Sequence, residues 1–153
     1  MKNLLILLLT AVLSFSCLNK PLRYADIHVQ SLPEANEGKS LPVHIIPVDD
    51  ALYNRIASIK PEEWFVDDMV ETTRNIQKLV FRGRDTKILR VERLDNKNNF
   101  LVVTDFANTK STELQRVYIG ERYWREKAVY LLVTRDTIRI VDKERYERNA
   151  ASN

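Results

Sequence analysis

Glycine, cysteine and histidine are scarce in this chain, and each scarcity excludes a class of functional site. The 153 residues include three glycines, one cysteine and two histidines. Three scattered glycines cannot form the glycine-rich loops that hold phosphate groups. One cysteine cannot form a disulfide within the chain, and no cysteine or histidine follows the ligand spacing of a zinc site. We therefore expect neither a metal site nor a phosphate-binding loop.

An excess of charge of one sign is also missing. The chain has 24 Lys and Arg residues against 21 Asp and Glu residues, which gives a formal net charge of +3. A nucleic-acid-binding domain usually shows a clear basic excess or a basic stripe. We therefore expect no nucleic-acid partner.

The N-terminus has the pattern of a secretory signal. A short head with one cation, Lys2, precedes an almost unbroken apolar run from Leu4 to Phe15. This run is shorter than the roughly 20 apolar residues that span a bilayer as a helix. The small residue Ser16 and the single cysteine, Cys17, follow directly. A charged head, a short apolar run and a small residue before the cut are typical of a cleaved signal peptide.

The five residues Leu13-Ser14-Phe15-Ser16-Cys17 resemble the lipobox of bacterial lipoproteins. The resemblance implies a signal peptide over residues 1–16, cleavage before Cys17, and acyl chains on Cys17 that anchor the protein without any other cofactor. Each buried CH2 of such a chain contributes about 0.8 kcal/mol. Leu18, rather than Asp, follows the cysteine, which under the lipoprotein sorting rule implies the outer membrane. An ordinary secretory signal with an incidental cysteine, or a buried N-terminal helix, is the alternative.

The rest of the chain has mainly the pattern of short β-strands. Residues 17–24 are expected to be a lipidated tether, residues 25–142 one β-sandwich domain, and residues 143–153 a charged C-terminal tail. Short apolar runs separated by turn signals every eight to twelve residues indicate a sandwich. The predicted strands are 26–32, 41–48, 75–81, 86–94, 100–106, 114–119, 129–134 and 137–141.

Two features qualify this strand pattern. Pro42 and Pro47 lie in the second predicted strand, and because proline has no N–H to donate, we expect this strand to lie at a sheet edge or to begin and end at the prolines. A short helical insertion is expected after the second strand. Asp49 and Asp50 can cap its first helix, and Pro61 marks the start of a second helix that continues to Val70 and is anchored by Trp64.

No group of residues predicts catalysis. His28 and His44 lie on the first two predicted strands and could share a metal, but histidines without a common role are the better interpretation. Asp67 and Asp68 are consecutive on a predicted helix, so their carboxylates point apart and indicate a solvated face. The basic turn Arg82-Gly83-Arg84 could touch lipid head groups or be a solvated hairpin tip. We expect the protein not to be an enzyme and to bind no small-molecule substrate.

The order of these features resembles the outer-membrane lipoprotein of the type VI secretion system, the TssJ type. The resemblance rests on Asn36, Gly38, Ser40 and Pro42 before the strand at 43–48, and on the motifs that follow. These motifs are Trp64-Phe65-Val66-Asp67-Asp68 in the helical insertion and Phe100-Leu101-Val102-Val103-Thr104-Asp105-Phe106 in a later strand. The resemblance implies a transthyretin-like β-sandwich on the periplasmic face of the outer membrane.

The resemblance also implies a structural role and a partner. The lipoprotein would hold the periplasmic domain of an inner-membrane TssM-type subunit and help to build an envelope-spanning complex. The loop that contacts the partner in the family corresponds here to Pro33, Glu34, Ala35, Asn36, Glu37, Gly38, Lys39 and Ser40. A polar loop on a rigid sandwich is a reasonable recognition site, although a plain solvated turn is the alternative. We expect residues 36–39 to be exposed, so that Gly and Ser could replace them without loss of the fold.

Other functions remain open at this point. A pilotin that escorts an outer-membrane channel would have the same anchor, and so would a stand-alone envelope lipoprotein. A lipid-anchored envelope enzyme or a small-ligand binder would need catalytic residues or a large apolar cavity.

The anchor yields the first prediction. Exchanging Cys17 for Ser removes the thiol that would carry the lipid, so the variant should be found unprocessed or in the soluble fraction. Membrane fractionation, with mass measurement of the N-terminal peptide, checks this. Normal fractionation of the variant with the membrane would contradict it.

Overall fold

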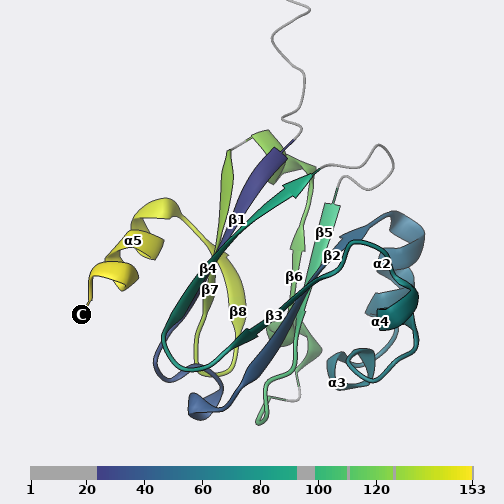
Figure 1. Cartoon of the computed structure of the whole chain (residues 1–153), viewed down its shortest axis with the longest axis horizontal. Helices are drawn as coiled ribbons and strands as arrows, with labels where there is room; N and C mark the ends of the chain where they lie inside the picture. The colour runs from purple at the N-terminus through teal and green to yellow at the C-terminus, as the bar shows by residue number, and fades with distance from the viewer. Residues whose placement is uncertain (1–23, 93–98, 110, 126, 153) are drawn as a thin grey trace, which may run out of the picture.

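The chain forms two four-stranded β-sheets packed face to face, with helices against their outer faces (Figure 1). The computed structural model describes residues 24–92, 99–109, 111–125 and 127–152. The predicted signal peptide and Cys17 lie outside the described residues. The expectation of a mainly β sandwich with a helical insertion after the second strand is confirmed.

The first sheet, here called the β1 sheet, has the strand order β4–β1–β7–β8. Its strands are β4 (Asp85–Glu92), β1 (Tyr24–Ser31), β7 (Ala128–Val133) and β8 (Ile138–Val141). Strand β1 pairs antiparallel with β4 and parallel with β7. The β7–β8 hairpin turns at Arg135 and Asp136, as predicted.

The second sheet, the β2 sheet, has the order β3–β2–β5–β6, and all its pairings are antiparallel. Its strands are β3 (Gln77–Phe81), β2 (Leu41–Val48), β5 (Asn99–Thr104) and β6 (Arg116–Ile119). A tight turn, η1 (Ala35–Gly38), and two short 3-10 helices, η2 (Thr112–Gln115) and η3 (Glu121–Arg125), lie in the connections.

The main core lies between the two sheets and follows from the alternation of the strands. Ile27 and Val29 of β1 face Val43 and Ile45 of β2, and all four side chains are fully buried. Successive side chains of a strand point to opposite faces, so apolar residues two positions apart all face inward. Full burial of each such side chain contributes about 1.5–3 kcal/mol.

Strand β2 lies inside its sheet, so the first of the two expectations for its prolines, an edge position, is wrong. The strand does begin and end within one residue of Pro42 and Pro47. Strand β3 pairs with residues 41–45 of β2, whereas β5 pairs with residues 43–48. Pro42 therefore has a partner only on the β3 side, and Pro47 only on the β5 side. The two prolines are five residues apart, so their ring nitrogens face opposite edges of the strand. Each nitrogen can face the side without a ladder, and no ladder bond is lost.

The helical insertion covers the outer face of the β2 sheet. It consists of α2 (Asp50–Ala57), α3 (Pro61–Trp64) and α4 (Met69–Thr72). The predicted cap is confirmed, because a carboxylate oxygen of Asp49 accepts a hydrogen bond from the backbone N–H of Leu52 at 2.8 Å.

The second predicted helix is divided into α3 and α4, which the sequence pattern did not show. Trp64 and Met69 are both buried against the sheet, but five residues of a continuous helix would turn them about 140° apart. The chain breaks between them, and Asp67 accepts a hydrogen bond from the backbone N–H of Met69 at 2.7 Å, which starts α4. Val66 lies at the break and is 85% exposed.

A second core fills the space between the insertion and the β2 sheet. Trp64 and Ile56 of the helices pack there against Ile46, Val48 and other outward-facing apolar residues of β2 and β5. His44 is the buried polar member of this face of β2, with only 7% of its side chain exposed. Its Nδ1 accepts a hydrogen bond from the indole Nε1 of Trp64 at 3.1 Å. Burial, with a smaller contribution from Lys78, lowers the pKa of His44 to about 4.

The C-terminal tail is a helix, α5 (Lys143–Ala151), that packs on the outer face of the β1 sheet. Its residue Tyr146 is buried against Leu132 and Val141. The guanidinium of Arg84, in the basic turn between β3 and β4, donates hydrogen bonds to the carbonyl oxygens of Asn149 and Ser152 at 3.1 Å each. Arg84 therefore satisfies carbonyl groups at the end of α5, where a cation also complements the helix dipole.

His44 predicts how stability depends on pH. In the unfolded chain its pKa is near 6.5, whereas in the folded chain it is about 4, so the unfolded state binds more protons between these values. Stability is therefore fully present above pH 6.5 and falls as the pH decreases toward 4. A His44→Gln variant should lose less unfolding free energy over this range than the parent chain.

Denaturant unfolding at a series of pH values measures this difference. His28→Gln removes the histidine of the opposite sheet and serves as the control, which should fall with pH as the parent does. Equal slopes for the parent and His44→Gln between pH 6.5 and 4 would contradict the assignment.

Candidate partner-binding surface

The loop between β1 and β2 has an unusual backbone. Asn36, Glu37 and Gly38 have φ values of 48°, 55° and 76°, so three consecutive residues are left-handed. Glycine adopts this conformation freely and asparagine does so more readily than most residues, whereas for glutamate it costs energy. A run of this kind persists only where surrounding contacts fix it.

Asn36 provides these contacts. Its side chain is only 3% exposed. Its Nδ2 donates a hydrogen bond to the carbonyl oxygen of Ser40 at 2.8 Å, and its Oδ1 accepts one from the backbone N–H of Ala107 at 2.8 Å. Its own backbone N–H donates to the carbonyl oxygen of Arg135 at 3.0 Å. One buried residue thus joins three separate connections of the fold.

Further bonds hold these connections together. The guanidinium of Arg135 lies 3.3 Å from a carboxylate oxygen of Glu37, and the hydroxyl of Thr109 donates to the carbonyl oxygen of Asp136 at 3.1 Å. We call residues 33–40, 105–109 and 134–137 the distal loop surface. In Figure 1 this surface lies at the lower end of the sandwich, while β1 begins at the upper end with Tyr24.

Gln115 fixes the connection between β5 and β6 from inside. Its Oε1 accepts a hydrogen bond from the backbone N–H of Phe106 at 2.8 Å, and its Nε2 donates to the carbonyl oxygen of Thr109 at 3.0 Å. The hydroxyl of Thr104 donates to the backbone carbonyl oxygen of Gln115 at 2.9 Å. Gln115 is almost fully buried, so these bonds are protected from water.

The charges of the distal loop surface are partly paired. Hydrogen bonds from Asn108 and Arg135, and the nearby charge of Lys39, lower the pKa of Glu37. Burial, together with the charge of Glu62, raises the pKa of Asp105. The surface therefore presents a carboxylate that stays ionised at Glu37 and a less acidic one at Asp105.

The structure places the predicted loop residues in two groups. Six are exposed and could reach a partner: Pro33, Glu34, Glu37, Gly38, Lys39 and Ser40. Ala35 and Asn36 are buried. The expectation that residues 36–39 are all exposed is therefore wrong for Asn36, because the loop needs its amide to close on Ser40 and Ala107. Partner binding by the exposed residues stays a prediction.

The sequence did not point to the other residues of this surface. Ala107, Arg135 and Gln115 are separated from Asn36 by 71 or more positions along the chain, and no local motif marks them. Asn36 followed by Glu and Gly was the one available signal, since Asn and Gly favour left-handed backbone. That pattern predicts a turn but does not reveal what the amide of Asn36 binds.

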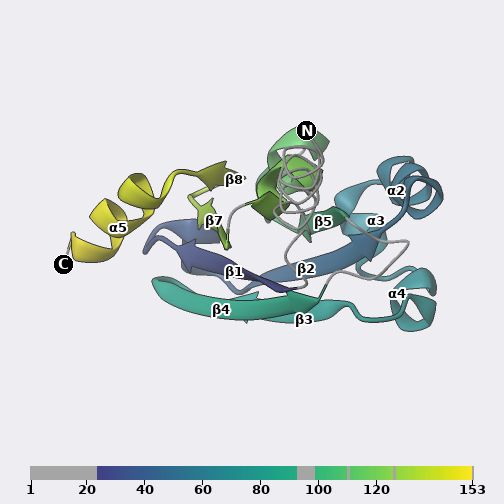
Figure 2. The same ribbon diagram turned by 90° about the horizontal axis from the view of Figure 1, so that it is seen from above.

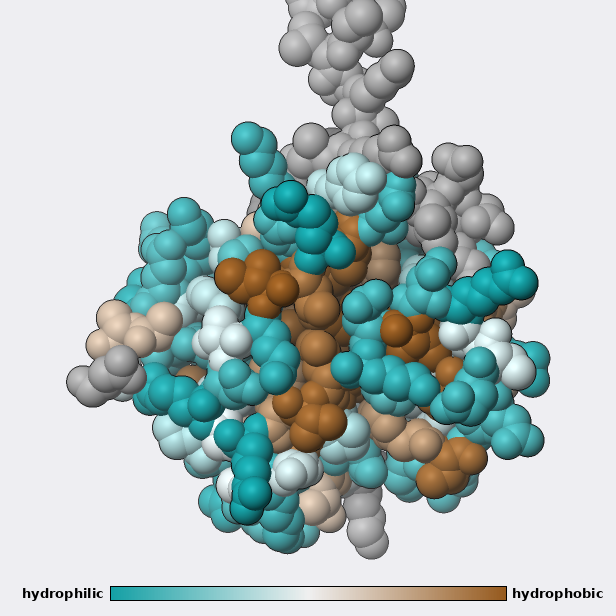
Figure 3. Space-filling model, viewed as in Figure 1, coloured by the Kyte–Doolittle hydropathy of each residue, from teal (hydrophilic) through white to brown (hydrophobic). Residues whose placement is uncertain are grey.

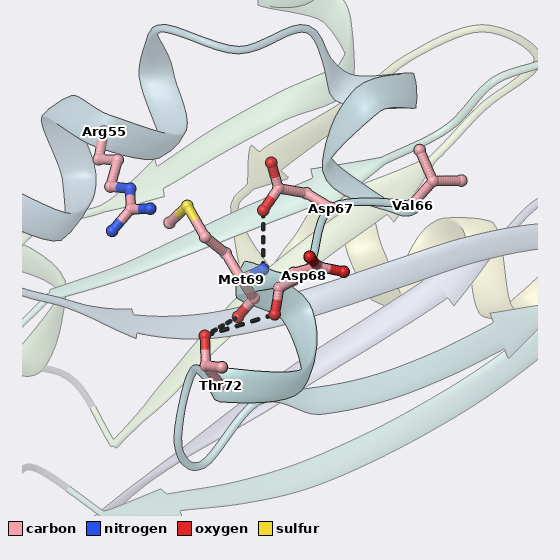
Figure 4. A pocket seen from close by; sticks show the side chains of 6 residues that line it. All are labelled: Arg55, Val66, Asp67, Asp68, Met69 and Thr72. Atoms are coloured by element: carbon pink, nitrogen blue, oxygen red, sulfur yellow. Dashed lines mark hydrogen bonds between the residues drawn. The ribbon is translucent and has the colours of Figure 1, made fainter.

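A cleft of about 490 Å³ lies between α2 and the α3–α4 segment (Figure 4). Its lining includes Arg55 on one side and Asp67, Asp68 and Thr72 on the other. Asp67 accepts a hydrogen bond from the backbone N–H of Met69, the first residue of α4, and the hydroxyl of Thr72 donates to the carbonyl oxygens of Asp68 and Met69 at 3.4 and 3.3 Å. The lining groups thus stabilise the short helix, and the predicted carboxylate pair does not converge on one point.

The two histidines lie in different sheets and cannot share a ligand. His28 of the β1 sheet lies 4.9 Å, centroid to centroid, from the ring of Tyr130, whereas His44 of the β2 sheet contacts Trp64. Within the part of the chain that the structure describes, no three His, Cys, Asp or Glu side chains come together as metal ligands. In the same residues, no helix has the length and apolar content to cross a bilayer.

The fold and the distal loop surface define a two-sheet sandwich that displays a set of mutually bonded loops at one end. Solved structures share this fold. No family model matches the sequence, and no curated protein matches it either. The similarity is therefore one of structure at low sequence identity.

Three solved structures illustrate the similarity. The Serratia marcescens protein Lip, a membrane-bound component of the type VI secretion system, superposes with a TM-score of 0.63 at 10% identity, over 80% of this chain and 99% of that one. The type VI lipoprotein TssJ1 from Pseudomonas aeruginosa gives 0.56 at 13% identity, over 79% and 96%. A structure of the TssM C-terminal domain from EAEC, also of this system, gives 0.66 at 12% identity, over 79% and 99%.

These similarities confirm the fold that the sequence resemblance implied. The chain has the β-sandwich of the TssJ-type lipoprotein structures, at a sequence distance that leaves its function to be tested.

Asn36 provides the test of the loop architecture. An Asn36→Ala variant loses both side-chain bonds and leaves the N–H of Ala107 without its acceptor. We therefore expect its free energy of unfolding to be about 1–3 kcal/mol lower than that of the parent chain. Lys39→Ala is the control within the same loop. Lys39 is exposed and has extended backbone, so its change should stay within about 0.5 kcal/mol. Equal unfolding free energies for the two variants in denaturant titrations would refute the role of Asn36.

Proposed function

We propose that this protein is a lipoprotein anchored to the outer membrane through acyl chains on Cys17, and a structural subunit of a type VI secretion membrane complex. The observation that carries the proposal is the fold, which the chain shares with Lip and TssJ1 over nearly the whole length of those structures. The lipobox-like segment at residues 13–17 supports the anchor independently of the fold.

The geometry of the sandwich supports this function. Six residues separate Cys17 from Tyr24, so the tether can extend over at most about 24 Å before β1 begins. Strand β1 then runs away from the tether for eight residues, or roughly 25 Å, and ends at the loop of residues 33–40. Tyr24 and the distal loop surface therefore lie at opposite ends of the domain, so the loops would face away from a membrane that holds Cys17.

We propose that the partner is the periplasmic domain of an inner-membrane protein of the TssM type. One of the similar structures is described as the TssM C-terminal domain, and this supports the choice. The exposed residues of the loop, Pro33, Glu34, Glu37, Gly38, Lys39 and Ser40, would contact the partner. Because Asn36 and Arg135 fix the loop before binding, little conformational entropy would be lost on association.

A role without catalysis is part of the proposal. The side chains that most often perform chemistry have structural contacts here. His44 accepts a hydrogen bond from Trp64, Asp67 accepts one from the N–H of Met69 at the start of α4, and Asp49 caps α2. The similar structures are a membrane-bound component and a lipoprotein of the type VI secretion system, which is consistent with this role.

The test is a crosslinked pull-down of the tagged, lipidated protein from bacterial envelopes, with identification of bound proteins by mass. We expect a large inner-membrane protein with a periplasmic C-terminal domain. A double variant, Glu34→Lys with Lys39→Glu, reverses two exposed charges of the loop and should reduce capture about tenfold. Both positions lie outside the strands, so thermal stability should be unchanged.

Glu144→Lys is the matched control. It reverses an exposed charge on α5, away from the distal loop surface, and should leave capture unchanged. Capture of an outer-membrane channel subunit instead would replace the proposal with the pilotin function. Equal capture by the loop variant and the control would remove the loop from the interface.

A further inference from the structure

The two ends of the sandwich differ in their aromatic side chains. The chain has six tyrosines, and two of them, Tyr130 and Tyr146, lie on the outer face of the β1 sheet where α5 packs. The other four lie toward the end at which β1 begins, here called the tether end: Tyr24, Tyr53, Tyr118 and Tyr123. No tyrosine or tryptophan occurs in the distal loop surface or in the turn of residues 82–84.

The order and pairing of the strands place these four tyrosines. Tyr24 begins β1. Tyr118 is the last residue but one of β6 and is on a level with Ile46, near the end of β2. The ring of Tyr53 lies 5.0 Å, centroid to centroid, from that of Tyr118. Tyr123 belongs to η3, which connects β6 to β7 at the upper end in Figure 1, and Figure 2 looks onto this end.

Two of these rings are exposed, and a third carries a cation. Tyr24 is 46% exposed and Tyr118 is 43% exposed. The guanidinium of Arg122 lies 4.7 Å from the centroid of the Tyr123 ring and donates a hydrogen bond to its hydroxyl at 2.7 Å. Tyrosine has an apolar ring and a polar hydroxyl, and such side chains gather at membrane–water interfaces.

The charges of the tether end nearly balance. Arg122 and Lys127 are exposed cations, and Glu92 and Glu121 are exposed acids. The two cations therefore act as hydrogen-bond donors for single phosphate groups rather than through a broad positive field. Figure 3 shows strongly apolar residues along the middle of the visible face, whereas the described residues at its upper end are hydrophilic or intermediate. Such a surface suits the head-group layer of a membrane rather than its hydrocarbon core.

The basic turn of residues 82–84 lies at the opposite end of the domain. Ser31, the last residue of β1, donates a hydrogen bond from its hydroxyl to the carbonyl oxygen of Gly83. Strand β1 extends over roughly 25 Å, so this distance separates Tyr24 from the turn. A domain that rests on a membrane with its tether end therefore holds this turn away from the lipid.

We propose that the tether end lies on the phospholipid head groups of the membrane that anchors Cys17. Tyr24 and Tyr118 would lie among the head groups, and Arg122 and Lys127 would donate hydrogen bonds to phosphates. The inference rests on the proposed anchor, because a tether of at most about 24 Å keeps this end within reach of the membrane. With this second attachment the domain cannot turn freely on its tether, and the distal loop surface stays directed away from the lipid.

The test replaces the native anchor, so it does not require acyl chains on Cys17. Residues 18–153 with an N-terminal polyhistidine tag are bound to vesicles of phosphatidylethanolamine and phosphatidylglycerol that contain a nickel-chelating lipid. A further lipid in these vesicles carries a nitroxide on its head group and quenches nearby tryptophan. All variants contain Trp124→Phe, which leaves the fully buried Trp64 as the one native tryptophan and as an equal background in each.

Tyr118→Trp and Leu114→Trp are matched reporters, because the native side chains are 43% and 41% exposed and lie four positions apart. Leu114 precedes β6 at its distal end, where its carbonyl oxygen accepts a hydrogen bond from the hydroxyl of Thr137. We expect the emission of Tyr118→Trp to fall by about half, since an interfacial ring lies among head groups, and that of Leu114→Trp to stay unchanged. Tyr24→Trp is a second reporter of the tether end if Tyr118→Trp unfolds.

The double variant Arg122→Ser with Lys127→Ser should reduce the quenching at Tyr118→Trp about threefold, because hydrogen bonds to phosphates are lost. Arg82→Ser with Arg139→Ser is the control, since it removes two exposed cations from the turn and from β8, and it should leave the quenching unchanged. Equal quenching of the two reporters, or no quenching at the tether end, overturns the proposal. Fractionation of Cys17→Ser tests the anchor separately, so a failure of one proposal is distinguishable from a failure of the other.

Discussion

Strand β2 is buried on both of its faces, and the position of the other layers follows from this. Its residues Val43 and Ile45 pack toward the β1 sheet, while Ile46 and Val48 pack toward the helical insertion. Neither face can remain in water, because each of these side chains contributes about 1.5–3 kcal/mol only when it is covered. The segment that follows β2 must therefore fold back over the strand from which it emerges, and it does so as three short helices rather than one.

The burial of both faces also explains the one polar pair in the second core. His44 shares its face of β2 with Ile46 and Val48, so its ring enters the layer beneath the helices. There the indole N–H of Trp64 needs an acceptor, and the neutral imidazole provides one. A neutral imidazole accepts the indole hydrogen bond without burying a charge. A protonated imidazole could not accept this bond, and its charge would be removed from water at a cost in free energy. The same contact fixes α3 on the sheet, while burial beneath the helices lowers the pKa of His44 and keeps its ring neutral.

Much of the fold could be predicted from local patterns, since alternation in β1 and β7 and the Asp49 cap act over a few residues. The predicted edge position of β2 was wrong because a proline indicates only that one N–H is missing, and the sequence does not show which side of the strand has a partner there. The break between α3 and α4 was missed because it follows from the sheet beneath Trp64 and Met69, not from the helix itself. At the distal loop surface, the sequence resemblance implied the loop, but the roles of Asn36, Ala107 and Arg135 depend on contacts between distant segments.

The pairing of β1 determines how this sandwich would bear a force applied between residue 24 and the loop of residues 33–40. Strand β1 connects the tether to the loop of residues 33–40, and it lies between β4 and β7. The hydrogen bonds of the antiparallel ladder with β4 run perpendicular to the strand, and those of the parallel ladder with β7 cross to it at a slant. If the lipid holds one end and a partner holds the other, the force acts along β1 and loads all these bonds together in shear. A border strand in this position would instead be peeled from one neighbour bond by bond, so a central β1 is the arrangement that resists such a load.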